Sequence, residues 1–284
     1  MKKKETAKII EKVRLAEDIY SLWIETEIAE ESAPGQFVMV YPKAETRLLG
    51  RPISICESER GRLRLVFRTV GAGTREFAGY ETGDTVELLG PLGNGFPIEE
   101  GRALLIGGGI GIPPLLGLAR ARKKEDNLIV AGYRTEDTYL TGDLSDVGIL
   151  YTAIEKLNGG DAGKRSDQPF LNELSRSDAT SKQACKQQLQ NITVGNVLDA
   201  IAKNSLKADI IYSCGPMPML AAVKSYAEKN GICAYLSLEE RMACGVGACL
   251  GCVCKTKEID AHSKVKNARV CKEGPVFAAD AVEL

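Results

Sequence analysis

The sequence predicts a multi-domain protein with an N-terminal antiparallel β-barrel, an α/β domain built on a parallel sheet, and a small C-terminal cysteine-rich module. Three observations predict these parts. Residues 1–99 contain short strand-like runs separated by Gly and Pro turns, residues 100–231 alternate strands with helices, and residues 232–284 carry a dense cysteine pattern. A chain of 284 residues can bury two ordinary cores and a small appendage.

The barrel is predicted from runs rich in β-branched and aromatic residues, each bounded by turn-forming residues. Several short strands in succession are typical of a small barrel. The expected strands are 7–14, 19–25, 36–40, 62–67 and 85–89, and a further strand begins at Arg51.

The α/β domain is predicted from continuous apolar runs at 103–106, 128–131 and 209–212, which are typical of buried parallel strands. Helical stretches follow the first and the last of these runs. The segment 158–191 is polar and poor in large apolar residues, so we expect an inserted surface loop, with a recognition element as the alternative. Its thiol, Cys185, is expected to be incidental.

Charge and hydrophobicity exclude several classes of function. The 37 basic and 38 acidic residues nearly cancel, so neither nucleic acid nor an anionic membrane is expected as a partner. No apolar run approaches the roughly 18 to 20 residues that span a bilayer. Nine cysteines, an odd number, without an apolar signal segment predict a cytoplasmic protein.

The most informative pattern is a C-x4-C-x2-C spacing near the C-terminus, with a fourth cysteine further on. This is the ligand pattern of a plant-type [2Fe-2S] cluster, so the chain is predicted to carry electrons. Interleaved glycines let the backbone wrap closely and point N–H groups at the sulfurs. The predicted ligands are Cys244, Cys249, Cys252 and Cys271, and the glycines are Gly245, Gly247 and Gly251.

Buried structural thiols or a zinc site are the alternative interpretation, because Cys249-x2-Cys252 alone is a common zinc half-site. A zinc site would usually add a second C-x2-C or a pair of histidines. The chain has one histidine, His262, which we expect to be exposed. Cys254 would fit a cluster if the register shifted by two residues, but we expect it to be a buried non-ligand.

A glycine-rich turn after strand 103–106 predicts a nucleotide site. Glycines remove the Cβ atoms that would collide with a pyrophosphate, and the helix that follows offers free N–H groups. Prolines suit its first turn. The motif lacks the third glycine of G-x-G-x-x-G, so its strand–turn–helix context carries the prediction. The glycines are Gly107, Gly108, Gly109 and Gly111.

Cys214, Gly215 and Pro216 form a second turn of this kind, between strand 209–212 and a helix expected at 217–229. Ligands of open α/β sheets bind at the carboxyl ends of the strands. Taken alone, these residues fit an ordinary strand-to-helix turn equally well. Together with the glycine-rich turn they favour a nucleotide site.

Two arginines of the barrel are candidate phosphate ligands. The guanidinium group is a planar, permanently charged fork that matches phosphate oxygens. Nearby hydroxyls add donors, and glycines allow close backbone approach. On residue chemistry alone, both arginines could equally be surface residues of the barrel rim. The residues concerned are Arg51, Ser54, Arg68, Gly71, Gly73 and Thr74.

The order of these motifs resembles the ferredoxin reductase superfamily and, within it, the electron-transfer subunits of class 1B dihydroorotate dehydrogenase. The resemblance rests most on residues 237–254, SLEERMACGVGACLGCVC, and 270–277, VCKEGPVF. It covers nearly the whole chain apart from the insert at 158–191, which is longer than expected. Many ferredoxin reductases place an aromatic residue on the flavin at the third position of Arg-x-x-Ser, whereas this chain has Ile53, as the dihydroorotate dehydrogenase branch commonly does.

The resemblance implies FAD and NAD as further cofactors. It also gives the four cysteines above as cluster ligands and leaves Cys254 out, although the gap from Cys252 to Cys271 is rather long for the family. FAD would be bound by Arg51, Pro52, Ile53 and Ser54, then by Val66, Phe67 and Arg68, then by Gly73 and Thr74. NAD would meet Gly107, Gly108, Gly109 and Gly111, together with Cys214, Gly215 and Pro216.

The function that the resemblance implies is electron transfer in pyrimidine biosynthesis. An FMN-containing catalytic subunit would oxidise dihydroorotate, and this chain would pass the electrons through the cluster and FAD to NAD. FAD is needed because a cluster passes one electron at a time, whereas NAD accepts a hydride. No catalytic residue for dihydroorotate is expected in this chain, and the expected assembly contains two of each chain.

Two other functions stay open. The first is an NAD(P)H:ferredoxin-type oxidoreductase subunit with another redox partner; some such relatives use an Asp and three cysteines around the cluster, so the all-cysteine set argues against it. The second is a redox-sensing or scaffold protein in which a cluster or zinc only controls binding, which an absence of bound flavin would favour.

Overall fold

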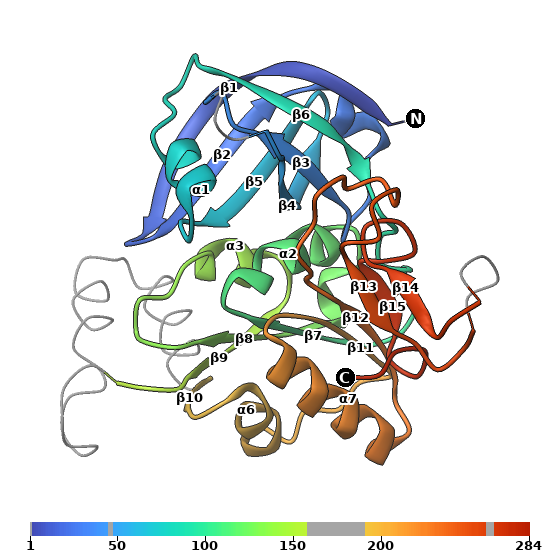
Figure 1. The fold of residues 1–284 in the computed structure, drawn as a ribbon. Helices are drawn as coiled ribbons and strands as arrows, with labels where there is room; N and C mark the ends of the chain where they lie inside the picture. Colours follow the sequence, from blue (N-terminus) through green and yellow to red (C-terminus); the bar gives the residue numbers. More distant parts are fainter. Residues whose placement is uncertain (1, 45–47, 158–190, 260–263) are drawn as a thin grey trace, which may run out of the picture.

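The computed structural model describes residues 2–44, 48–157, 191–259 and 264–284. The predicted insert at 158–191, except for its last residue, and the predictions for Cys185 and His262 lie outside these ranges. The fold class predicted from the sequence is confirmed: a barrel, a parallel-sheet domain and a C-terminal module are all present (Figure 1).

The N-terminal part is a closed antiparallel barrel with strand order β1-β2-β5-β4-β3-β6. Alternate side chains of each strand point inward, because successive residues of a strand face opposite sides. Val38 and Val40, for example, pack inside the barrel with Leu22, Leu65 and Val86. The strands are β1 (Lys3–Ala16), β2 (Ile19–Glu25), β3 (Phe37–Tyr41), β4 (Arg51–Glu59), β5 (Arg62–Arg68) and β6 (Thr85–Leu92), with the 3-10 helix η1 (Glu27–Glu31) and helix α1 (Ala72–Ala78) in the connections.

The second part is a seven-stranded sheet with order β10-β9-β8-β7-β11-β12-β15. All of its neighbouring strands run parallel except β12 and β15. The central strand β7 is buried along its whole length, as a strand covered on both faces must be. The strands are β7 (Ala103–Gly108), β8 (Asn127–Tyr133), β9 (Ile149–Ile154), β10 (Ile192–Val194), β11 (Ile210–Cys214), β12 (Cys233–Ser237) and β15 (Val276–Ala278).

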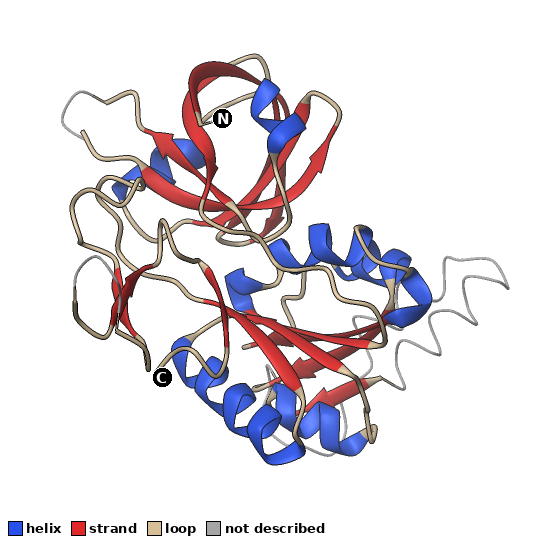
Figure 2. Ribbon diagram, turned by 90° about the vertical axis from the view of Figure 1, so that its right-hand side faces the viewer, coloured by secondary structure: helices blue, strands red, loops and turns tan. Residues whose placement is uncertain are grey.

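Helices cover both faces of this sheet, as Figures 1 and 2 show. On the face towards the barrel lie α2 (Pro113–Arg120) and α3 (Thr141–Val147), and on the opposite face lie α6 (Val197–Lys203) and α7 (Met217–Asn230). Two short 3-10 helices, η2 (Gly109–Gly111) and η3 (Lys124–Asp126), flank α2. Among the described residues, no helix combines the length and the apolar character needed to cross a membrane.

The order of the strands places a topological switch point between β7 and β11. From β7 the chain proceeds to β8 on one side, whereas β11 pairs with β7 on the other side. In open α/β sheets, ligands bind at the carboxyl ends of the strands at such a point. Both turns predicted to meet a nucleotide leave the sheet here.

The C-terminal module is joined to the sheet. Its strand β12 pairs in parallel with β11, and β15 pairs antiparallel with β12, so both extend the sheet of the α/β domain. Between them, β13 (Val253–Lys255) and β14 (Asn267–Arg269) form a small hairpin. The domain boundary expected between residues 231 and 232 stays a prediction. The seven-stranded sheet contains strands from both sides of this boundary.

Candidate functional site

The cysteine loop occupies residues 241–252, between β12 and β13, and contains neither helix nor strand. Gly245 (φ 67°) and Gly247 (φ 86°) adopt left-handed backbone, which glycine reaches without steric cost. A residue with a Cβ would be strained at both positions. The glycines therefore let the chain turn tightly around the thiols, as the sequence predicted.

Backbone N–H groups of this loop point at the thiol sulfurs. Ala248 N and Cys249 N donate to Cys244 Sγ at 3.3 and 3.4 Å, and Gly251 N donates to Cys249 Sγ at 3.4 Å. Burial alone would raise the pKa of Cys244. Hydrogen bonds to its sulfur from Cys249 and neighbouring residues of the loop have the larger combined effect and lower this pKa to about 6. The loop thus favours the thiolate, which is the form that binds metal.

The four predicted ligands form two pairs. Cys244 lies against Cys249, and Cys271 N donates to Cys252 Sγ at 3.4 Å. The pKa of Cys271 is raised to about 12. Burial is the largest cause, the Cys252 thiol is the next, and Cys244 adds a further contribution. The two pairs are therefore close enough to interact electrostatically.

This pairing decides which metal group the thiols fit. A [2Fe-2S] cluster needs two thiolates for each of its two irons, and the two pairs of thiols meet this requirement. The residues present therefore fit this cluster.

Cys254 lies outside the cysteine loop, two residues beyond Cys252. It belongs to β13, where it pairs with Ala268 of β14, and its side chain is half-buried against the core. Burial raises the pKa of its thiol, and the Cys252 thiol adds to this shift. This placement supports the prediction that Cys254 is not a ligand.

Three residues that the sequence did not single out hold the cysteine loop. Arg269 Nη1 donates to Gly247 O at 3.1 Å, and the Arg269 guanidinium pairs with the Glu273 carboxylate. Asn94, which follows β6, donates through Nδ2 to Glu273 O at 2.8 Å. Arg269 and Glu273 lie four residues apart, but Gly247 and Asn94, which they contact, lie far away in the sequence, so no local pattern marks the contacts with the loop.

The predicted flavin residues gather at one end of the barrel, on the start of β4, the end of β5 and the first turn of α1. Arg51 and Gly73 are in direct contact: a Cβ on Gly73 would lie 2.7 Å from Arg51 Nε. Thr74 is buried, and its hydroxyl accepts from Val70 N at 2.9 Å and Gly71 N at 3.1 Å. Thr74 therefore fixes the turn that presents Gly73 to Arg51.

Arg68 offers a donor at this rim that is ion-paired but not hydrogen-bonded. Its Nε lies 3.1 Å from Asp18 Oδ2, but the contact lacks hydrogen-bond geometry, so this buried N–H has no hydrogen-bond partner among the described residues. An unpaired buried donor is costly unless a ligand meets it. The permanent charges of Arg51 and Arg68, with the close approach at Gly73, fit the pyrophosphate of a flavin dinucleotide.

Several predicted flavin residues contribute backbone or packing rather than an exposed side chain. Val66 is buried on the side of the α/β domain, whereas Ile53 and Phe67 face the barrel interior. Pro52 and Ser54 are half-buried on β4, opposite Met39 and Phe37. A cofactor at this rim would meet the main chain of Ile53 and Phe67.

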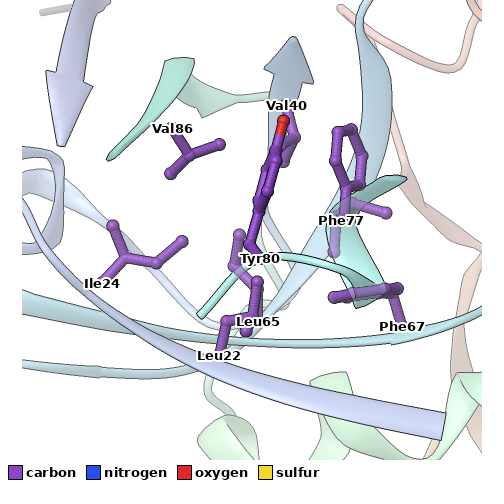
Figure 3. A pocket seen from close by; sticks show the side chains of 9 residues that line it. Leu22, Ile24, Val40, Leu65, Phe67, Phe77, Tyr80 and Val86 are labelled. Carbon is purple, nitrogen blue, oxygen red and sulfur yellow. The ribbon is translucent and has the colours of Figure 1, made fainter. Parts of the chain in front are cut away.

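The barrel interior is too small for a cofactor. It contains a cavity of about 10 Å³ with an apolar lining (Figure 3), which is about the space of one water molecule. Ile53, Phe67 and Phe77 line it, and the Tyr80 ring closes it while the Tyr80 hydroxyl donates to Glu76 Oε1 at 2.9 Å. A flavin would therefore bind outside the barrel.

The two predicted nucleotide turns lie against each other at the switch point. A Cβ on Gly111 would lie 2.6 Å from Gly215 N, and a Cβ on Gly108 would lie 3.1 Å from Pro216 Cδ. Cys214 pairs with Gly107 in the β11–β7 register. Glycine is required here because the two turns approach so closely, and the sequence prediction of one joint site agrees with this contact.

The barrel rim meets the glycine-rich turn at Gly109. A Cβ on Gly109 would lie 3.8 Å from an Nη of Arg68. On the other side, Tyr139 Oη donates to Gly109 O at 2.6 Å, and Tyr133 Oη donates to Tyr139 O at 2.6 Å. Burial raises the pKa of Tyr139 well above its usual range, so this hydroxyl stays protonated as a donor. The predicted flavin and nucleotide sites thus adjoin, and Tyr139 is a residue that the sequence prediction missed.

Comparisons with known proteins agree with this arrangement. A family model described as the iron-sulfur cluster binding domain of dihydroorotate dehydrogenase B matches residues 239–283. The electron transfer subunit of dihydroorotate dehydrogenase B (NAD(+)) from Listeria monocytogenes is 36% identical, with 98% of both chains covered. The subunit of the same name from Shouchella clausii is 38% identical, with 100% of this chain and 99% of that protein covered.

Solved structures with this fold include an NADH-dependent reduced ferredoxin-NADP oxidoreductase. It is 26% identical, with a TM-score of 0.72, and the alignment covers 98% of this chain and 89% of that one. The ferredoxin reductase of carbazole 1,9a-dioxygenase, at 21% identity and a TM-score of 0.56, covers 81% of this chain and 67% of that one and shares the fold.

Proposed function

The chain belongs to the family of electron transfer subunits of NAD⁺-dependent dihydroorotate dehydrogenase B, and we propose that it carries electrons from a dihydroorotate-oxidising partner to NAD⁺. The observation that supports this proposal most is that one chain contains three candidate cofactor sites. These are the paired thiols, the barrel rim with Arg51 and Arg68, and the two adjoining glycine-rich turns. Each site suits one cofactor of an electron relay.

The thiolates of Cys244, Cys249, Cys252 and Cys271 would hold the cluster, and the N–H groups of the loop would stabilise its negative charge. When bound, the cluster supplies one-electron transfer, and FAD supplies the exchange between single electrons and the hydride that NAD⁺ accepts. The protein's own contribution is to bind these groups and fix their orientation.

The barrel rim would hold FAD. Arg51 and Arg68 would neutralise and hydrogen-bond the pyrophosphate, Arg68 through donors that include the Nε–H now ion-paired but not hydrogen-bonded to Asp18, and Gly73 leaves room for the approach. The main chain at Ile53 and Phe67 would flank the isoalloxazine ring, while their side chains stay in the barrel core.

The two turns at the switch point would hold NAD⁺. The main-chain N–H groups of the glycine-rich turn and the start of α2 would bind its phosphates. Tyr139 orients this turn through Gly109 O, and Arg68 faces the same glycine from the barrel. The nicotinamide would therefore bind on the side of the turn that faces the flavin rim.

The partner that this proposal requires is an FMN-containing catalytic subunit, with two copies of each chain in the complex. No catalytic residue for dihydroorotate is assigned to this chain. A cytoplasmic location also stays a proposal, in keeping with thiolates that must remain reduced to bind iron.

A second candidate is an NAD(P)H:ferredoxin-type oxidoreductase subunit with another redox partner. The likeness to the NADH-dependent reduced ferredoxin-NADP oxidoreductase, at 26% identity over nearly the whole chain, favours it. It uses the same sites and differs in the electron donor.

Co-purification with an FMN-containing dihydroorotate-oxidising subunit tests both candidates. Under anaerobic conditions, dihydroorotate should bleach the flavin and cluster absorbance of the complex, and added NAD⁺ should restore it with NADH formation. The mass of the complex gives the stoichiometry. If NADH reduces the flavin of this chain but dihydroorotate with the partner does not, the second candidate is correct.

A further inference from the structure

Strand β3 has two apolar faces, and each face packs into a different hydrophobic core. Val38 and Val40 point into the barrel core. Phe37 and Met39 point outward and belong to a second core, which also contains Cys252 and Cys271. The outer face of β3 is therefore packed against the module that carries the cluster ligands.

Met39 is the residue of this face that touches the cysteine loop. Its side chain is fully buried. A Cβ on Gly245 would lie 2.6 Å from Met39 Cγ and 2.9 Å from Met39 Sδ. Gly245 directly follows the ligand Cys244, so the thioether packs against the backbone of the loop at its first ligand.

The same side chain touches the segment that opens the flavin motif. A Cβ on Gly50 would lie 3.1 Å from Met39 Cε, and Gly50 directly precedes Arg51. Met39 also pairs with Pro52 in the β3–β4 register. One buried methionine thus bridges the loop of the cluster and the strand of the flavin rim.

We propose that Met39 is a positioning residue that sets the packed contact between the cysteine loop and the flavin-binding strand, and that electron exchange between the cluster and FAD depends on it. The inference rests on the proposed function. Each exchange moves one electron from one cofactor to the other and forms no bond; NADH, or dihydroorotate through the partner, is the electron source.

The physical reason lies in packing. Protein interiors are as dense as organic crystals, and a void between two groups removes the contacts that hold them at a fixed distance. Methionine is unbranched and polarizable, so it can fill an irregular gap between two backbone segments. Removing Sδ and Cε of Met39 would leave a void between the backbone at Gly245 and the backbone at Gly50.

The test compares three variants of the cofactor-loaded chain. Met39→Val removes Sδ, which reaches Gly245, and Cε, which reaches Gly50, but keeps a residue suited to a strand. Met39→Leu conserves volume and should rescue the contact. Ile24→Ala creates a cavity in the barrel core, where Ile24 is fully buried, and controls for general loss of stability.

Stopped-flow mixing with NADH separates two events: flavin bleaching, which needs no cluster, and the later reduction of the cluster. In Met39→Val the first should keep its wild-type rate, and the second should slow several-fold, because a void between the two segments removes the contacts that hold the two sites at a fixed distance. Met39→Leu and Ile24→Ala should both reduce the cluster at wild-type rates.

Two readouts besides turnover complete the test. The reduction potentials of flavin and cluster should be unchanged in Met39→Val, so that the slower rate reflects coupling and not driving force. Iron should be lost to a chelator faster from Met39→Val than from Met39→Leu. Equal cluster-reduction rates in Met39→Val and the wild type would overturn the inference, whereas a wild-type flavin that NADH does not reduce would overturn the proposed function itself.

Discussion

A buried charge network ties the barrel to the α/β domain, and its centre is Glu57 of β4. Glu57 is 3% exposed, and its Oε2 lies 2.7 Å from Arg64 Nη1. Its Oε1 pairs with Arg120 of α2, and Arg64 also contacts Asp143 of α3 at 3.1 Å. Beside this network α2 packs directly on β4: a Cβ on Gly117 would lie 2.6 Å from a β4 carbonyl oxygen.

Glu57→Ala should destabilise the chain strongly. The Arg64 side chain is only 11% exposed, so it would keep a buried charge with its main partner removed. Removing one member of a buried ion pair typically costs about 3–5 kcal/mol. Because Asp143 and the Ser21 hydroxyl, which accepts from Arg64 Nε at 3.0 Å, would remain, we expect a cost near the lower value.

Glu59→Ala on the same strand is the matched control. The Glu59–Arg62 pair is 45% exposed at both side chains, and exposed pairs contribute about 0–1 kcal/mol. Urea unfolding followed by far-UV circular dichroism and by the fluorescence of Trp23, the single tryptophan, measures both variants. A cost for Glu57→Ala no larger than that for Glu59→Ala would refute the reasoning.

Four further substitutions test the cofactor sites. Cys271→Ser should lose the cluster and Cys254→Ser should keep it; equal iron and sulfide contents in the two variants would overturn the assigned register. Arg51→Ala should weaken FAD retention, and an unchanged flavin content after dialysis would remove this arginine from the site. Tyr139→Phe should raise the KM for NADH without lowering flavin content, since it removes one of the two donors to Gly109 O and leaves only Ile112 N at 3.0 Å, a loss of about 0.5–1.5 kcal/mol; an unchanged KM would show that the hydroxyl does not shape the nucleotide turn.

The parts that the sequence predicted are those encoded within short windows. The ligand spacing from Cys244 to Cys252 and the glycines between them are a local pattern, and the structure forms the expected tight turns there. The continuous apolar run of β7 is likewise local, because a central parallel strand is buried on both faces. Such patterns need no knowledge of the tertiary fold.

The parts that the sequence did not predict depend on contacts across the chain. Strand β9 was missed because Tyr151 and Thr152 interrupt the apolar run of its sequence, ILYTAI. Arg269 and Tyr139 act through carbonyl groups on other elements, at Gly247 and Gly109. Nothing in the residues around either side chain indicates its partner.

The cluster module is bound to both other parts of the molecule, and this bears on how electrons can move. β12 and β15 extend the sheet, Asn94 N donates to Gly274 O at 2.6 Å, and Gly93 leaves no room for a Cβ beside Pro275. Met39 adds the contact with the barrel. Because the first contacts hold the module on the sheet and Met39 touches the cysteine loop at Gly245, we expect that a swing of the loop towards the flavin rim would break a packed core. Electron exchange between the two sites should therefore proceed at one fixed separation, set by packing. Its rate should respond to substitutions at the contact and remain insensitive to solvent viscosity, which would slow a moving domain.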